Sequence, residues 1–317
     1  MSDGTIAARP LRVEVVGAGG LGSYVAGILA NAGHDVRLVI RGAHAEAVET
    51  RGLEIRTPRD GFLAHPRPVS PESAPAPADV AFVAVKAYSL DEVAPRLAAL
   101  AAEGAVVVPL LNGVDISDRL RAAGVPEDRL VDGVAYLTAF RTAPGVVERK
   151  GEHQRLVIGS TGGHNAQGLQ TIHDLFAPTD VEVVTADDIR VEIWLKMAVV
   201  SALATICGIT GAALGPIRAH PFGRDLQTGA ISEVLAVGRG HGVALPPDAE
   251  SRVERTLDGF PESFYPSVLH DLRSGRRTEM DALGGTLARL GRAVGVPTPL
   301  LDAATCAVAL NEVTPED

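Results

Sequence analysis

A lysine and a glutamate in the second half of the chain have side chains that could move a proton. Lys196 lies in the apolar run Ile193 to Met197, where its ammonium would lose part of its hydration. Desolvation lowers the pKa of an amine, so Lys196 is a candidate proton donor near neutral pH; a lysine that only extends its charge to solvent fits equally well. Glu279 follows Thr278 near an expected helix start. Taken alone, it is better explained as a carboxylate that complements the helix dipole.

The segment GAGGLG contains a G-x-G-x-x-G motif formed by Gly17, Gly19 and Gly22. The motif follows the strand-like run Arg12 to Val16 and opens a helical stretch, which is the context that a dinucleotide-binding fingerprint requires. Its glycines permit a tight turn, close approach of pyrophosphate to backbone N–H groups, and close packing of the helix on the sheet. We therefore favour a dinucleotide site over an ordinary glycine-rich turn. The expected cofactor-binding residues of this segment are Gly17, Gly19, Gly20, Leu21 and Gly22.

A guanidinium group ends the second strand-like run. Arg41 follows Val36 to Ile40, where an NAD-specific site would carry the acidic residue that bonds the ribose 2′-hydroxyl. A carboxylate would repel a 2′-phosphate, whereas a guanidinium binds it through two hydrogen bonds. Arg41 therefore predicts NADP(H) as the cofactor; the alternative is a solvated arginine at a strand end.

A cation and an amide follow two later strand-like runs. Lys86 comes directly after Val80 to Val85, and Asn112 follows Ala105 to Pro109. The carboxyl ends of parallel strands meet at the edge where doubly wound sheets bind ligands. Each residue alone is unspecific, but with the fingerprint they indicate a place where nicotinamide and substrate meet.

The first half alternates β-branched runs with amphipathic stretches, which is typical of βαβ units and predicts an α/β fold with a largely parallel sheet. The expected strands are Arg12 to Val16, Val36 to Ile40, Val80 to Val85, Ala105 to Pro109 and Leu130 to Thr138, with shorter pieces at Val146 to Arg149, Leu156 to Gly159 and Val181 to Val184. The expected helices are Leu21 to Ala32, Ala43 to Arg51, Leu90 to Ala102 and Ile116 to Ala123. Five prolines make His65 to Asp79 a surface excursion. Ala-rich helical periodicity after about Asp187 predicts two domains, residues 1–186 and 187–317.

Composition limits the class of protein. The 317 residues carry 29 Lys plus Arg against 39 Asp plus Glu, a formal net charge of −10, which disfavours nucleic acid as a partner. Only 4% of residues are aromatic, so the core must be aliphatic. Two cysteines make neither a disulfide framework nor a four-ligand zinc site, and we expect no metal. Residues 1–12 lack a signal peptide's apolar region, and the uncharged stretch Ala198 to Ile217 is expected to be a buried helix and a turn, so we expect a cytoplasmic protein without membrane contact.

Over most of its length the chain resembles the ketopantoate reductase (2-dehydropantoate 2-reductase) family. Four features agree in order and spacing: GAGGLG; Val85-Lys86 with Leu111-Asn112-Gly113; Trp194-Leu195-Lys196; and Arg277 to Asp281 followed by GVPTP. The resemblance implies an amino-terminal Rossmann-type doubly wound domain and an all-helical carboxyl-terminal domain of the 6-phosphogluconate dehydrogenase type.

The same resemblance implies roles for individual residues. Lys196 would donate a proton to the ketone, with Glu279 as its partner, and Ser267 would bind the substrate carboxylate. Asn112 would lie between nicotinamide and substrate, and Lys86 near either one. The implied activity is NADPH-dependent reduction of a 2-oxo acid to a 2-hydroxy acid, with ketopantoate to pantoate as the default.

Three positions depart from the family pattern. The family's substrate-facing asparagines, four and eight residues after the catalytic lysine, are here Val200 and Ala204, and Gly284 stands where the family often has asparagine. Ser201 and Thr205 lie one residue out of register, and a local bulge could bring them to the site. We therefore keep Val200 and Ala204 as substrate-facing positions of changed specificity.

The departures leave three alternatives open. One is a paralogue that reduces a less hydroxylated 2-oxo acid, the second is an opine or imine reductase, and the third is an NADP-binding protein without turnover. Retention of both Lys196 and Glu279 argues against the last. The Ala-rich helices of the second half allow a homodimer but do not require one.

Overall fold

The computed structural model describes residues 9–162 and 165–312, and the chain forms two compact units. The first unit holds residues up to Val85, Ser89–Leu111 and Ser117–Ile189, and the second holds Lys86–Tyr88, Asn112–Ile116 and the residues from Arg190 onward. The sequence placed the boundary between residues 186 and 187, and the two units divide after Ile189. Two short segments of the first half, however, belong to the second unit. The expectation that the chain has no signal peptide concerns residues 1–12, of which 1–8 lie outside the described residues.

The first unit is built on a parallel five-stranded sheet with the order β5-β2-β1-β6-β7. Its strands are β1 (Arg12–Val16), β2 (Asp35–Val39), β5 (Arg67–Val69), β6 (Val80–Val83) and β7 (Val106–Pro109). β6 and β7 are buried along their whole length, as expected for a parallel sheet covered on both faces. A first strand in the centre, with the chain crossing to either side, is the Rossmann arrangement, so the α/β prediction is confirmed.

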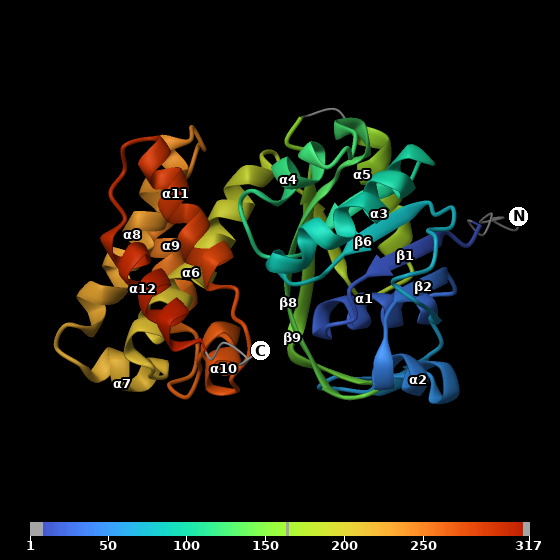
Figure 1. Ribbon diagram of the computed structural model, residues 1–317, viewed down its shortest axis with the longest axis horizontal. Coiled ribbons are helices and arrows are strands. Elements are labelled where there is room, and N and C mark those ends of the chain that lie inside the picture. The colour runs from blue at the N-terminus through green and yellow to red at the C-terminus, as the bar shows by residue number, and fades with distance from the viewer. Residues whose placement is uncertain (1–8, 163–164, 313–317) are drawn as a thin grey trace, which may run out of the picture. The chain divides into compact units, whose positions relative to one another are not determined.

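A second sheet in the same unit was only partly predicted. It has the order β10-β9-β3-β4, and β8 pairs with β9 as a long antiparallel hairpin (Figure 1). Its strands are β3 (Leu53–Arg56), β4 (Gly61–Ala64), β8 (Asp132–Ala143), β9 (Val146–Gly159) and β10 (Glu182–Thr185). β3 and β4 were missed, and the two short pieces expected between residues 146 and 159 are one strand. The excursion at residues 65–79 also contains β5, whose Pro68 lies on the sheet edge, where proline is tolerated.

Helix α1 lies in the core that the two sheets share. Val13 and Val15 of the parallel sheet, Tyr24 and Leu29 of α1, and Ile55 of the second sheet belong to one buried cluster. The helices of this unit are α1 (Gly20–Asn31), α2 (Gly42–Arg51), α3 (Leu90–Ala102), α4 (Ile116–Ala122) and α5 (Ala166–Phe176), with short 3-10 turns at Ala87–Ser89 (η1) and Glu127–Arg129 (η2). The core is mainly aliphatic, as the composition predicts, although it also contains the aromatic rings of Tyr24, Phe82 and Phe176.

From Arg190 to Glu312, the structure contains helices and turns without a strand, as predicted. The helices are α6 (Ile189–Thr210), α7 (Leu214–Ala219), α8 (Gly223–Gly240), α9 (Ala249–Asp258), α10 (Ser267–Arg273), α11 (Thr286–Ala293) and α12 (Pro299–Asn311), with a π-helical turn at Asp281–Gly285 (η3). α6 is the one described helix long and apolar enough to cross a membrane. Its Ala198, Ala202 and Ile206 are fully buried in the core of the second unit, as the prediction of a buried helix requires.

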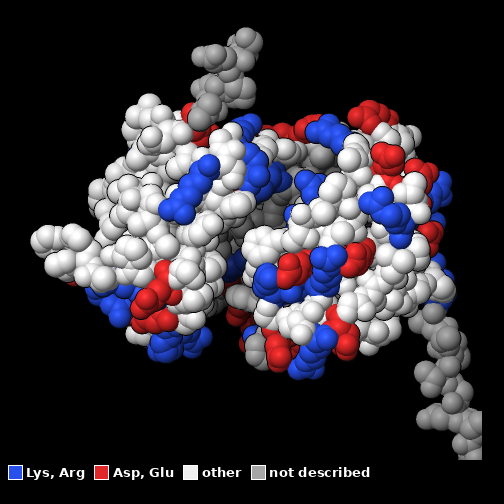
Figure 2. Space-filling model, turned by 90° about the horizontal axis from the view of Figure 1, so that it is seen from below, with Lys and Arg blue, Asp and Glu red and all other residues white. Residues whose placement is uncertain are grey.

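Charged side chains on the surface are largely balanced by neighbours. Figure 2 shows one face of the molecule, on which Lys and Arg side chains lie close to Asp and Glu side chains. In the second unit, Arg239 pairs with Glu250 at 2.6 Å. Exposed pairs of this kind add little stability, but they keep the local charge low.

Candidate active site

Two of the three fingerprint glycines occupy positions that a larger residue could not fill. Gly17 has a φ of +109°, and a Cβ there would lie 2.7 Å from the Ala84 carbonyl. A Cβ on Gly22 would lie 1.9 Å from the Gly17 carbonyl oxygen. Gly19, by contrast, is exposed and would have nothing within 4 Å of its Cβ. The first and third glycines are therefore required by packing, and the second leaves open space at the start of α1, where the fingerprint places a pyrophosphate.

Arg41 lies at the end of β2 and is the N-cap residue of α2. Its side chain is exposed, and it forms no ion pair with the described residues. Glu72 is an acidic neighbour, since the pKa of Glu72 is lowered by its hydrogen bond with Ser70 and, to a smaller extent, by the charge of Arg41. No described carboxylate is within ion-pair distance, so the guanidinium can bind an anion. This placement agrees with the expectation that Arg41 binds the 2′-phosphate of NADP(H), which stays a prediction.

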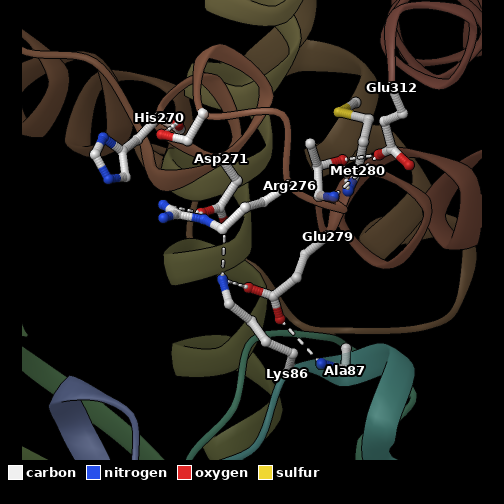
Figure 3. Close-up of polar contacts among 10 residues, drawn as sticks. Lys86, Ala87, His270, Asp271, Arg276, Glu279, Met280 and Glu312 are labelled. Carbon is white, nitrogen blue, oxygen red and sulfur yellow. Dashed lines mark hydrogen bonds and ion pairs between the residues drawn. The ribbon is translucent and has the colours of Figure 1, made fainter. Parts of the chain in front are cut away.

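Lys86 lies between two carboxylates of the second unit (Figure 3). Its Nζ is 2.7 Å from Glu279 Oε2 and 3.2 Å from Asp271 Oδ2. The backbone N–H of Ala87 donates to the other oxygen of Glu279 at 3.0 Å. Arg276 donates from Nε and Nη2 to Asp271 Oδ1 at 3.0 and 2.8 Å. The four side chains form a neutral cluster that fixes both oxygens of Glu279.

Burial and charge act in opposite directions on Lys86. Burial by itself lowers the pKa of its ammonium, but the carboxylates of Glu279 and Asp271 outweigh burial and raise the pKa above the usual range for lysine. Lys86 therefore remains a cation. The short segment that carries it is also held by Tyr88, over whose ring the Arg277 guanidinium lies at 4.3 Å from the centroid.

Asp271 and Arg276 were missed in the sequence. Asp271 follows Ser267 by four residues in α10, so the two share one face of that helix. Arg276 directly precedes the Arg277 to Asp281 motif. The sequence could have pointed to them only through their closeness to Ser267 and to the Arg277 to Asp281 motif.

Lys196 differs from Lys86 in its electrostatics. It lies in the third turn of α6, partly buried, and burial lowers the pKa of its ammonium to about 8. Glu279 was the expected partner of Lys196, but Glu279 pairs with Lys86, and no described residue forms an ion pair with Lys196. Lys196 therefore has the pKa of a group that can give up a proton near neutral pH.

One apolar cluster supports the other expected site residues. We call it the site cluster; its buried members are Met197, Ala204, Val268, Met280, Leu283, Ala304 and Val308, and Val114, Ile193 and Val200 pack against it partly exposed. Met197, Val268 and Met280 directly follow Lys196, Ser267 and Glu279. Val114 follows Asn112 by two residues. Four polar residues from distant parts of the chain are thus anchored on one support in the second unit.

The structure separates the two positions at which the family pattern has asparagine. Val200 is partly exposed at the rim of the site cluster, whereas Ala204 is 0% exposed inside it. The expectation that Ala204 faces substrate is therefore wrong for this structure, because surrounding apolar side chains enclose it. Ser201 and Thr205 are also fully buried, and α6 runs through them as a continuous helix, so no bulge brings them to Val200's place.

Gly284 is enclosed as well. A Cβ on it would lie 2.4 Å from Met280 Cε and 2.6 Å from Thr305 Oγ1. The space that a larger residue would need here is filled by a methionine of the site cluster. Where the family often has an asparagine amide, this chain therefore has the Met280 side chain packed against a glycine.

A Rossmann sheet with an open glycine loop, together with a helical unit that carries a lysine of lowered pKa, defines a dinucleotide-dependent oxidoreductase. Comparison with known families identifies it further. The family model described as "Ketopantoate reductase PanE/ApbA" matches residues 13–163, and the one described as "Ketopantoate reductase PanE/ApbA C terminal" matches residues 188–312. The chain belongs to the ketopantoate reductase family, as its sequence motifs predicted.

Related proteins carry more than one description. The chain is 29% identical to a 2-dehydropantoate 2-reductase of Mesorhizobium japonicum, covering 92% of this chain and 95% of the relative. It is 28% identical to an uncharacterized oxidoreductase of Bacillus subtilis, with 92% and 96% covered. The crystal structure of a PanE/ApbA family ketopantoate reductase from Ralstonia eutropha is similar with a TM-score of 0.85 at 30% identity, covering 95% of this chain and 98% of that one. A D-mandelate dehydrogenase bound to NADH and anilino(oxo)acetate shares the fold, with a TM-score of 0.86 at 22% identity over 95% and 98% of the two chains.

Proposed function

We propose that this protein reduces a 2-oxo acid to a 2-hydroxy acid with NADPH. The observation that carries the proposal is Lys196, an ammonium of lowered pKa that forms no ion pair with the described residues. Its neighbour Met197 packs in the same apolar cluster as Val268, which follows Ser267. Such an ammonium suits a reaction in which negative charge develops on a carbonyl oxygen.

The residues of the glycine loop fit a dinucleotide. The open space at Gly19 admits the pyrophosphate, and Arg41 would bind the 2′-phosphate that distinguishes NADP(H) from NAD(H). When bound, the reduced nicotinamide supplies a hydride to the substrate carbonyl carbon.

The chain's own residues would then handle charge and protons. Lys196 would bind the carbonyl oxygen and donate a proton from Nζ as the alkoxide forms. Ser267, exposed at the first turn of α10, would donate to the substrate carboxylate. Glu279 would act through Lys86, because their ion pair holds the carboxylate in place and leaves the Lys196 ammonium to donate its proton to the substrate.

Two substrate classes follow from two observations. Several relatives are named 2-dehydropantoate 2-reductases, which favours ketopantoate. The apolar rim formed by Val114, Ile193 and Val200, with the amide at Gly284 also lost, favours a 2-oxo acid whose side chain lacks hydroxyl groups. A buried substrate hydroxyl without a partner would weaken binding by about 1–3 kcal/mol.

The test is an NADPH absorbance assay with ketopantoate and a panel of branched and aryl 2-oxo acids. We expect oxidation of NADPH with at least one of them, and faster turnover with NADPH than with NADH. Turnover only after an amine is added would identify an imine reductase. NADPH binding without turnover on any carbonyl substrate would identify a non-catalytic cofactor-binding protein. The cytoplasmic location, the small-molecule partner and the absence of membrane or nucleic-acid binding remain predictions.

A further inference from the structure

The long β8–β9 hairpin lies directly against the start of α1. A Cβ on Gly20 would be 2.0 Å from the Ala139 carbonyl oxygen and 2.9 Å from the Phe140 Cα. Gly20 is not one of the fingerprint glycines, which are Gly17, Gly19 and Gly22, so the dinucleotide motif does not explain its contact with the hairpin. The hairpin backbone therefore packs directly against the glycine loop at the start of α1.

Arg141 lies on the face of the hairpin that meets α1. Side chains alternate along a strand, so Arg141 lies on the same face as Leu137 and Ala139, which both pack against the core that contains α1. Its Nη1 donates to the Ala18 carbonyl oxygen at 3.5 Å, within the glycine loop itself. The guanidinium is thus held beside the open space at Gly19.

Buried hydrogen bonds fix the tip of the hairpin in place. The Gly145 N–H donates to His44 Nδ1 at 2.8 Å, so the other ring nitrogen of His44 carries the hydrogen and donates to Ser23 Oγ at 3.2 Å. Burial, reinforced by the nearby charge of Arg141, lowers the pKa of His44 to about 4. His44 is therefore neutral and ties the hairpin to α1 and α2.

Arg141 has no ion-pair partner among the described residues, and its side chain is exposed. Several other arginines of this unit do form ion pairs, such as Arg12 with Asp79 at 2.9 Å and Arg96 with Glu14 at 2.6 Å. In a chain of net charge −10, the guanidinium group of Arg141, with that of Arg41 partly offset by the nearby Glu72, gives the glycine loop a local positive field.

We propose that Arg141 binds the pyrophosphate of the dinucleotide, while Arg41 binds the 2′-phosphate. Contact with the Ala18 carbonyl places Arg141 at the glycine loop, where the pyrophosphate sits, and Arg41 lies at the end of β2, where the adenosine ribose sits. The assignment rests on dinucleotide binding, which is part of the proposed function, and it does not depend on the substrate.

The experiment measures binding by calorimetry, without turnover, for NADPH, NADH, ADP-ribose and adenosine 2′-monophosphate. Arg141→Gln should weaken NADPH, NADH and ADP-ribose by the same factor, about tenfold or more, and leave adenosine 2′-monophosphate unchanged. Arg41→Gln should weaken only the two ligands that carry a 2′-phosphate. Lys150→Gln, an exposed change on the same hairpin, is the matched control and should change none of them.

Two results of the binding experiment would overturn the role proposed for Arg141. Equal affinities for Arg141→Gln and wild type would overturn the proposal. A loss confined to NADPH and adenosine 2′-monophosphate would assign Arg141 to the 2′-phosphate and also overturn it. Because Arg141 is exposed, unchanged thermal melting is expected, and Arg141→Lys should restore part of the affinity. Wild-type binding without turnover of any 2-oxo acid would reject the proposed function while leaving the role of Arg141 standing.

Discussion

Glu279 forms its ion pair with Lys86, at 2.7 Å, and not with Lys196. The two lysines therefore have opposite electrostatics. The pKa of Lys86 is raised by its two carboxylates, and the pKa of Lys196 is lowered by burial to about 8. Lys86 is a permanent positive charge that holds Glu279, and Lys196 is the group able to exchange a proton.

The ion pair between Lys86 and Glu279 should be energetically coupled. Glu279 is 8% exposed, so Lys86→Met leaves a buried carboxylate without its cation and should cost about 1–3 kcal/mol in denaturant unfolding. The double variant Lys86→Met/Glu279→Gln should lose less free energy of unfolding than the sum of the losses of the two single variants. The exposed pair of Arg289 and Asp281, at 2.8 Å, is the control and should show coupling near zero. Strict additivity at Lys86 and Glu279 would contradict the geometry.

The rate of reduction should depend on the protonation of Lys196. Because its pKa is about 8, the donating form predominates below pH 8 and declines above it. The kcat for 2-oxo acid reduction should therefore fall as the pH rises through 8. Lys196→Gln should lower kcat by about 10²–10⁴-fold, abolish that pH dependence and leave the affinity for NADPH nearly unchanged. A variant of near-normal rate, or a profile whose descending limb survives the substitution, would remove Lys196 from the proton transfer.

The parts of the site that the sequence predicted are those with a local signature. The strand-turn-helix context of Gly17 to Gly22 depends on residues next to one another, and it was recognisable for that reason. Lys86 contacts Asp271 and Glu279, which follow it in the sequence by 185 and 193 positions, and no short motif encodes pairs so far apart. The partner of Glu279 was misassigned because the resemblance supplied roles without distances.

The second sheet was hard to predict for a related reason. Charged residues from Glu148 to Arg155 interrupt the apolar pattern of β9, but pairing with β8 on both sides of an irregularity, at residues 148–150 and from Arg155 onward, holds the strand in the sheet. Long-range pairing overrides a weak local pattern here. In α6, helical spacing placed Val200 and Ala204 on one face, yet only the packing shows that Ala204 is enclosed.

Asparagine at the two α6 positions should therefore have unequal effects. Val200→Asn, at the partly exposed rim, should fold normally and raise kcat/KM for ketopantoate relative to a branched 2-oxo acid, because it restores an amide for a substrate hydroxyl. Ala204→Asn places a larger, polar side chain in the site cluster and should cost about 2 kcal/mol or more in stability. Assays on both substrates and thermal melts of both variants give the comparison. Normal stability of Ala204→Asn with a gain on ketopantoate would show that Ala204 opens to the substrate after all.

Two adjacent glycines of the cofactor loop offer a matched pair of substitutions. Gly19→Ala meets no atom within 4 Å, and its φ of −71° suits alanine, so the variant should melt like wild type. Its added methyl group occupies the space for the pyrophosphate, so NADPH affinity should fall by about tenfold or more. Gly20→Ala places its Cβ 2.0 Å from the Ala139 carbonyl oxygen and should lower the melting temperature, because the hairpin must move. Calorimetric titration with NADPH and thermal melts separate the two effects. Unchanged NADPH binding in Gly19→Ala would mean that the dinucleotide does not lie on this loop, and the assignment of the cofactor site would be lost with it.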